Sequence, residues 1–203
     1  MPERISPGTL KVRFMNQKSI STHDLCVMAV FTAIIAVMAQ IVIPMPLLVP
    51  MTLQTLGIAL AGVMLGVKRG TLSVLVYVLA GALGAPVFAG MTGGLGTVFG
   101  PTGGFILSFP LLALVAGIGA EKSLSSQNQI TSALWLWSGI ITGISINYIC
   151  GAVYYSQYTS NDLITSFTAC VLVFIPTDII KILIAGLFGL KIRSILPKRI
   201  ISG

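Results

Sequence analysis

Apolar residues gather along this chain into long runs, separated by short polar or glycine-rich segments. Such runs predict helices that cross a lipid bilayer, whose hydrocarbon core takes about 20 apolar residues. The predicted spans lie at 25–43, 53–67, 71–83, 104–120, 131–153 and 176–193. The pattern therefore predicts an all-α, polytopic membrane domain of six transmembrane helices over residues 25–193.

The apolar run just before Pro176 departs from this pattern. Residues 163–175 would form a helix only about 20 Å long, which is too short for a core of about 30 Å. Pro176 suits the first turn of a new helix. We therefore expect 163–175 to lie at the outer face and the sixth span to begin at Pro176. One long kinked helix over 164–190, with Asp178 near the membrane midplane, is the alternative.

Composition and charge support a membrane location. The 203 residues are 55% hydrophobic and 8% charged, against about 25% charged in soluble domains, which leaves no room for a soluble catalytic domain. If the N-terminus is inside, every Lys and Arg except Lys181 falls on the inner side, as the positive-inside rule requires. We expect a cytoplasmic N-terminal segment (1–24) and a basic cytoplasmic tail (194–203). The net charge of +7 then reflects orientation in the bilayer, and no nucleic-acid partner is expected.

Two charged residues stand inside the last apolar run, FIPTDIIKILIAG at 174–186. Asp178 and Lys181 are three residues apart and share one helix face. A charge in the hydrocarbon costs at least about 2.5–3.5 kcal/mol, so such residues usually find a partner or face a cavity. The two either neutralise one another or line a ligand pocket with one acceptor and one donor.

Further candidates for a pocket come from glycine-rich and amide-bearing segments. Residues 84–104 carry no charge and combine many glycines with Phe88. Thr102 and Gly103 precede a predicted span, where backbone amides can donate to a ligand; a flexible surface loop is the alternative. Asn147 lies inside the fifth run, where its amide can either reach the pocket or bridge two helices. Gln54 flanks the proline-rich outer loop and can either line the mouth of the pocket or lie only at the membrane interface.

Small residues mark possible close contacts between helices. Ala29, Ala33 and Ala36 fall on one face of the first predicted span, and Gly62 and Gly66 are four residues apart in the second. Faces of this kind let helices approach closely in a bilayer. They predict either packing within the bundle or docking onto a partner membrane protein.

Three blocks together resemble the BioY family, the biotin-binding S components of energy-coupling factor (ECF) transporters. They are PMTLQTLGIALAGVMLGVKRG (50–70), GAPVFAG…GG…GPTGG (84–104) and FIPTDIIK (174–181). The resemblance implies a six-helix S-component fold in a prokaryotic plasma membrane, with an outward-facing biotin pocket. It also implies substrate contacts from Asp178 and Lys181. Ala29 and Ala33 match the family's docking face for a transmembrane coupling subunit that carries two ATPases.

One position departs from the family pattern. Many relatives have a basic residue in a block like FAGGRGG, whereas this chain has FAGMTGG, with Thr92 in the corresponding stretch. We therefore expect Lys181 to pair with the biotin carboxylate and Asp178 to accept from a ureido N–H.

Other functions stay open from the sequence. A stand-alone carrier could use Asp178 as a protonation site, and an S component could bind another vitamin. No phosphate-binding G-x-x-x-x-G-K-[ST] segment occurs, so energy from ATP would have to come from a partner. An enzyme is not expected, because the chain lacks clustered acids and His or Cys ligands. No cofactor or metal is expected.

Overall fold

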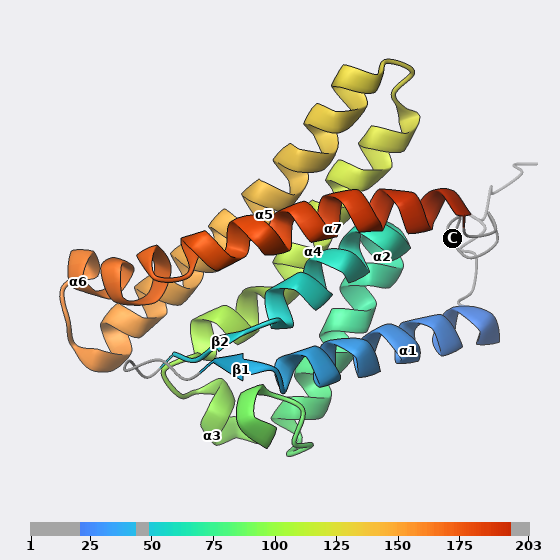
Figure 1. Cartoon of the computed structure of the whole chain (residues 1–203). Coiled ribbons are helices and arrows are strands. Elements are labelled where there is room, and N and C mark those ends of the chain that lie inside the picture. The colour runs from blue at the N-terminus through green and yellow to red at the C-terminus, as the bar shows by residue number, and fades with distance from the viewer. Residues whose placement is uncertain (1–20, 44–48, 196–203) are drawn as a thin grey trace, which may run out of the picture.

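The computed structural model describes residues 21–43 and 49–195, and it is built from helices (Figure 1). The predicted all-α class is confirmed. The long helices are α1 (Thr22–Ala39), α2 (Gln54–Ala82), α4 (Gly103–Ser125), α5 (Gln129–Thr159) and α7 (Ile175–Ile195). The short elements are β1 (Val42–Ile43), β2 (Met51–Thr52), a 3-10 turn (Ala89–Met91), α3 (Leu95–Val98), α6 (Leu163–Phe167) and a π-helical turn (Thr168–Leu172).

Helix α2 consists of two arms that fold back on one another. Gly66 breaks the helix with φ +78° and ψ −174°, a conformation that glycine adopts without a steric penalty. Gln54 Nε2 donates to the Tyr77 hydroxyl at 2.6 Å, although a straight helix would place these residues roughly 35 Å apart. The second and third predicted spans are therefore both present. The sequence pattern placed the turn between these spans at residues 68–70. In the structure the chain reverses slightly earlier, at Gly66.

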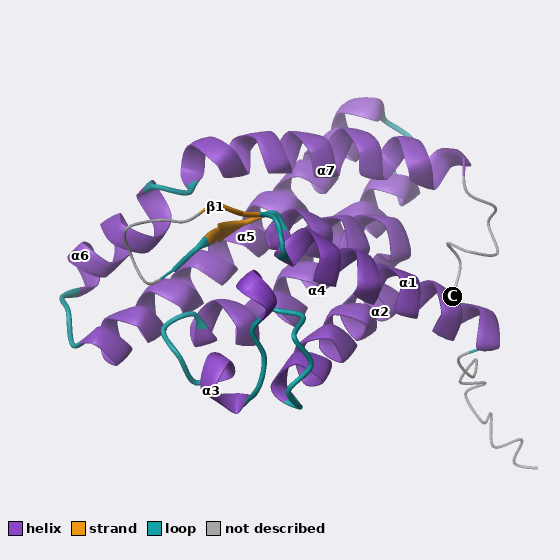
Figure 2. Cartoon of the chain, turned by 60° about the horizontal axis from the view of Figure 1, so that its bottom comes forward, coloured by secondary structure: helices purple, strands orange, loops and turns teal. Residues whose placement is uncertain are grey.

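The two arms of α2 complete a bundle of six helical segments. By length and composition, four of the described helices can cross a membrane, or five if the bent pair of α6 with its π-helical turn and α7 is one span. The six predicted spans correspond to six helical segments when the two arms of α2 are counted separately. The start of α1 and the end of α7 lie at the same end of the molecule (Figures 1 and 2), as an even number of crossings requires.

The helical structure is interrupted just before Pro176, as predicted from the sequence. Val173 and Phe174 separate residues 163–172 from α7, and the two pieces meet at 51°. Pro176 occupies the first turn of α7, where its missing N–H costs no helical hydrogen bond. Residues 163–172 therefore form a short, separate piece beside the end of α5 (Figure 2).

Small residues allow the central helix α4 to approach α2 and α5 closely. A Cβ added at Gly62 would lie 2.4 Å from the Ala113 carbonyl oxygen, and one at Gly119 would lie 2.7 Å from Gly139 Cα. Side chains at these positions would force the helices apart. Gly62 thus serves packing within the bundle, and Gly66 makes the turn of α2; neither forms a docking face.

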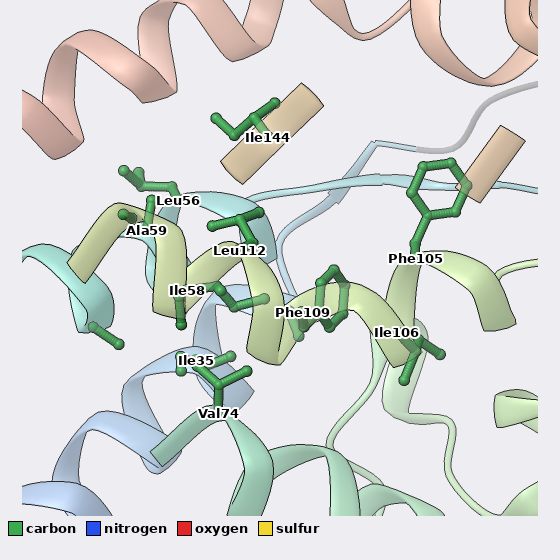
Figure 3. Packing of buried hydrophobic residues seen from close by; sticks show 14 of the residues in the cluster. Ile35, Leu56, Ile58, Ala59, Val74, Phe105, Ile106, Phe109, Leu112 and Ile144 are labelled. Atoms are coloured by element: carbon green, nitrogen blue, oxygen red, sulfur yellow. The ribbon is translucent and has the colours of Figure 1, made fainter. Parts of the chain in front are cut away.

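The hydrophobic core lies where α1, both arms of α2 and α4 meet. Ile35, Ile58, Val74 and Leu112 are fully buried there (Figure 3). Ile58 and Val74 come from opposite arms of α2, so folding back of α2 creates this core. On α1, Ala36 packs against the core while Ala29 and Ala33 are exposed.

Parts of the predicted cytoplasmic ends and of the outer loop lie outside the described residues. They are residues 1–20, 44–48 and 196–203. Six of the basic residues used to predict orientation belong to them: Arg4, Lys11, Arg13, Lys18, Lys198 and Arg199.

Candidate substrate-binding site

A cavity of about 360 Å³ opens between β2, the start of α2, the 88–102 loop and residues of α4, α5 and α7. This volume is within the range of about 300–1,000 Å³ found for small-ligand sites. The start of α4 lines the cavity, whereas the basic Lys122 lies near its other end. The cavity therefore sits at the end of the bundle that the positive-inside rule assigns to the outside.

Asp178 and Lys181 both line this cavity, one turn apart on α7. Lys181 Nζ lies 2.6 Å from Asp178 Oδ1, and the two residues are only 6% and 3% exposed. Tyr148 of α5 donates its hydroxyl hydrogen to Asp178 Oδ2. Thr55 Oγ1 accepts from Lys181 Nζ at 3.4 Å. The two alternatives from the sequence thus coexist, because the charges pair with one another and also face the cavity.

Asn147 brings an unused acceptor to the same cavity. Its Nδ2 donates to the Phe105 carbonyl oxygen at 2.9 Å and to Ser108 Oγ at 2.7 Å. The orientation of the amide follows, since a carbonyl can only accept and Ser108 Oγ already donates to the Gly104 carbonyl oxygen. Asn147 Oδ1 is fully buried and has no hydrogen-bond partner among the described residues. Asn147 therefore bridges α4 and α5, and also offers a free oxygen at the cavity that it lines.

Gln54 and Phe88 form one wall through a chain of contacts. Gln54 donates to the Tyr77 hydroxyl, which in turn donates to the Val87 carbonyl oxygen at 2.8 Å. Phe88 is 1% exposed and meets the Tyr77 ring edge-on, with 5.6 Å between ring centroids. A Cβ on Gly81 would lie 2.2 Å from the Phe88 ring, so Gly81 leaves the space that Phe88 fills. The Gln54 amide N–H group is thus already engaged in holding this wall.

Among the described residues, the mouth of the cavity carries hydroxyl groups and no charge. Thr92, Thr97 and Thr102 line it, and Thr92 Oγ1 donates to the Ala89 carbonyl oxygen at 2.9 Å. Gly103 is not among the lining residues: its N–H donates to the Gly100 carbonyl oxygen at 2.9 Å. Seven of the eight predicted site residues therefore meet at one cavity, and Gly103 packs behind it.

Three residues that the sequence analysis did not select take part in this site. Tyr148 and Thr55 hold the charged pair, and Tyr77 holds Gln54 and the Phe88 wall. Tyr148 directly follows Asn147 in an apolar helix, which was an available signal for a polar contact. Thr55 likewise directly follows Gln54, and Tyr77 is the one aromatic residue of α2, but neither signal shows which group the hydroxyl contacts.

The fold and the cavity define a class of protein: a multi-pass membrane protein with a sheltered, outward-opening site for a small molecule. A sequence model described as the BioY family matches residues 15–198. The chain belongs to the BioY family.

Curated relatives agree with this assignment. The chain is 37% identical over 170 residues to a protein of Thermotoga maritima named biotin transporter BioY, covering 84% of this chain and 95% of the relative. It is 37% identical over 158 residues to the probable biotin transporter BioY of Pyrococcus horikoshii, covering 75% and 95%. These proteins are named as transporters, and the chain accordingly belongs to a transport family and not to a family of enzymes.

A solved structure gives the same answer for the fold. The crystal structure of an S component for biotin from an ECF-type ABC transporter superposes with a TM-score of 0.75 at 30% identity, covering 84% of this chain and 90% of that one. The chain therefore has the S-component fold and is a multi-pass protein of the cell membrane.

Proposed function

We propose that this chain captures biotin from outside the cell and delivers it for ATP-driven uptake by a separate ECF module. The relatives that it matches are named for biotin. The observation that carries the proposal is the buried polar group of Asn147, Asp178 and Lys181 at one cavity. Biotin offers N–H donors and a carbonyl acceptor in its ureido ring, an apolar thioether ring and a flexible tail with a carboxylate.

The ureido ring is the part of biotin that fits the buried polar group. Asp178 and Lys181 lie 2.6 Å apart, so both meet the same end of a ligand. Asn147 and Tyr148 line the same cavity as the pair, and the Tyr148 hydroxyl reaches Asp178. We propose that Asn147 Oδ1 and Asp178 Oδ1 accept from ureido N–H groups, while Lys181 donates to the ureido carbonyl.

Charge balance favours the same orientation. The Asp178–Lys181 pair is neutral as a whole, and a neutral ureido ring keeps the buried end neutral. A carboxylate placed there would leave one excess negative charge in a water-poor site, which is costly. The sequence-based expectation that Lys181 pairs with the carboxylate is thus the competing orientation.

The tail of biotin then points to the mouth. Phe88, Phe105 and Phe174 line the same cavity and suit the thioether ring. Thr92 and Thr102 carry hydroxyls at the mouth, where the carboxylate can keep part of its hydration. A basic residue at position 92 is not required in this orientation.

The energy for uptake would come from partner subunits. We propose a transmembrane coupling subunit with two ATPases, as the S-component class implies. The small, exposed side chains of Ala29 and Ala33 form a face on which a helix of the coupling subunit can pack closely. Ala36 contributes less, because it packs against the core.

Binding of labelled biotin to the purified protein tests the proposal. Labelled biotin should bind, and unlabelled biotin should displace it, whereas riboflavin and thiamine should not displace it. Biotin methyl ester separates the two orientations: it should compete nearly as well as biotin if the ureido ring lies at Lys181, and fail if the carboxylate does. Absence of biotin binding by folded protein would refute the proposed function.

A further inference from the structure

The side chain of Gln40, at the C-terminal end of α1, is bonded mainly to a distant loop. Gln40 Nε2 donates to the Phe88 carbonyl oxygen at 3.1 Å and lies 3.4 Å from that of Val87. It also donates to the Ala36 carbonyl oxygen of its own helix at 2.9 Å, which fixes the amide on α1. Gln40 Oε1 accepts from the Met91 N–H at 2.8 Å. Both ends of one amide thus hold a segment about fifty positions further along the chain.

The segment that Gln40 holds is a tight and strained turn. Phe88 pairs with Thr92 across it, with Phe88 N–H donating to the Thr92 carbonyl oxygen at 3.0 Å. Gly90 and Met91 both have positive φ, 66° and 59°. A residue with a side chain is rarely found in this conformation, and it persists where the surrounding structure fixes it. The bond from Met91 N–H to Gln40 is such a constraint.

The same turn forms a wall of the cavity. Phe88, Ala89 and Thr92 line it, whereas Gln40 does not. The only side chain besides Gln40 that holds the carbonyl oxygen of Val87, among the described hydrogen bonds, is Tyr77. Loss of the Gln40 amide would leave the turn attached mainly through Tyr77.

We propose that Gln40 is a positioning residue for the binding site: it holds the 88–92 turn in place so that Phe88 and Thr92 close over the ligand. The proposal rests on the function proposed above, since biotin is the ligand used to test it. Gln40 acts without touching biotin, so its loss changes how long the ligand stays and not which ligand fits.

Two substitutions separate the halves of the amide. Gln40→Met removes donor and acceptor at similar size, whereas Gln40→Glu keeps an acceptor for Met91 N–H and loses all three donated bonds, to the carbonyl oxygens of Ala36, Val87 and Phe88. Hydrogen exchange of residues 87–92 should accelerate in the order wild type, Gln40→Glu, Gln40→Met. Biotin should dissociate about ten-fold faster from Gln40→Met, which corresponds to about 1.4 kcal/mol. Gln129→Met, on an exposed residue at the start of α5, is the matched control.

The outcomes distinguish this role from a general loss of stability. Faster exchange confined to 87–92, together with faster dissociation, supports the proposal. Unchanged exchange in 87–92, an equal rise in exchange across all helices, or unchanged dissociation despite faster exchange would each overturn it. If the wild type binds no biotin, the proposed function fails, while the exchange of residues 87–92 still decides whether Gln40 holds the turn.

Discussion

Two short ion pairs among the described residues lie at opposite ends of the bundle. Lys181 and Asp178 are 2.6 Å apart on one helix, and Arg69 and Asp24 are 2.7 Å apart between α2 and α1. Both cations are largely buried. Only the first pair lines the cavity.

The surroundings of the two pairs explain their different roles. Asp24 also belongs to the capping box of α1 with Ser21, so the Arg69 pair holds a helix start against α2. Asp178 lines a cavity large enough for a ligand, and its Oδ1 has no described hydrogen bond beyond its ion pair. Burial of an ion pair alone therefore does not identify a binding site; unused hydrogen-bonding capacity at a cavity does.

The largest effect on binding is expected from Lys181→Met. The substitution removes a donor and leaves Asp178 charged without its cation, and breaking a buried pair in this way costs about 3–5 kcal/mol. Biotin affinity should fall by about 100-fold or more, as measured with labelled biotin. Lys122→Met is the control, since Lys122 lies over the Trp135 ring at 4.1 Å and away from the cavity. Undiminished affinity would remove Lys181 from the site.

A somewhat smaller loss is expected from Asp178→Asn. The amide keeps an oxygen but loses a charge-assisted bond, worth about 1.5–3 kcal/mol, so affinity should drop by about 10- to 150-fold. Calorimetric titration with biotin measures this change. Asp162→Asn changes an exposed carboxylate that caps α6 and should leave affinity unaltered. An equal loss in both variants would indicate a global effect of charge.

Asn147→Leu should weaken binding by about ten-fold, because a ureido N–H would lose its acceptor. The change should affect biotin and its methyl ester equally, since the ester alters the other end of the ligand. The melting temperature must be followed in parallel, because Asn147 also bridges α4 and α5. Asn161→Leu, in an exposed loop, is the control. A loss seen with biotin but not with its ester would argue for the opposite orientation.

The smallest effect on binding is expected from Arg69→Met. This variant should bind biotin like the wild type, because Arg69 does not line the cavity. Its melting temperature should fall by about 2–4 °C, since α1 loses one of its ties to α2 and keeps the bond from Thr32 to the Ser73 carbonyl oxygen. Lys68→Met, at the exposed neighbouring position, should change neither property. Impaired biotin binding by folded Arg69→Met would show that the Arg69–Asp24 pair also affects the binding site, which contradicts a purely structural role.

Much of the site was predictable because a charge in an apolar run is conspicuous. Asp178 and Lys181 were selected on that ground, and both line the cavity. Asn147 stands out as an uncharged amide inside an apolar run, but its free oxygen depends on how Phe105 and Ser108 occupy its nitrogen. Gly103 was selected from a local motif, and the packing at the start of α4 places it behind the lining.

The sequence by itself determined the number of apolar segments, their orientation and the break before Pro176. These follow from transfer of each segment into lipid and from backbone chemistry, which are local properties. Tertiary structure decided the reversal at Gly66, the contact of Tyr148 with Asp178 and the hold of Gln40 on the 88–92 turn. The reversal brings the two arms of α2 together, and the other two features are contacts between residues that are far apart along the chain. Whether a polar group finds a partner depends on which helices become neighbours.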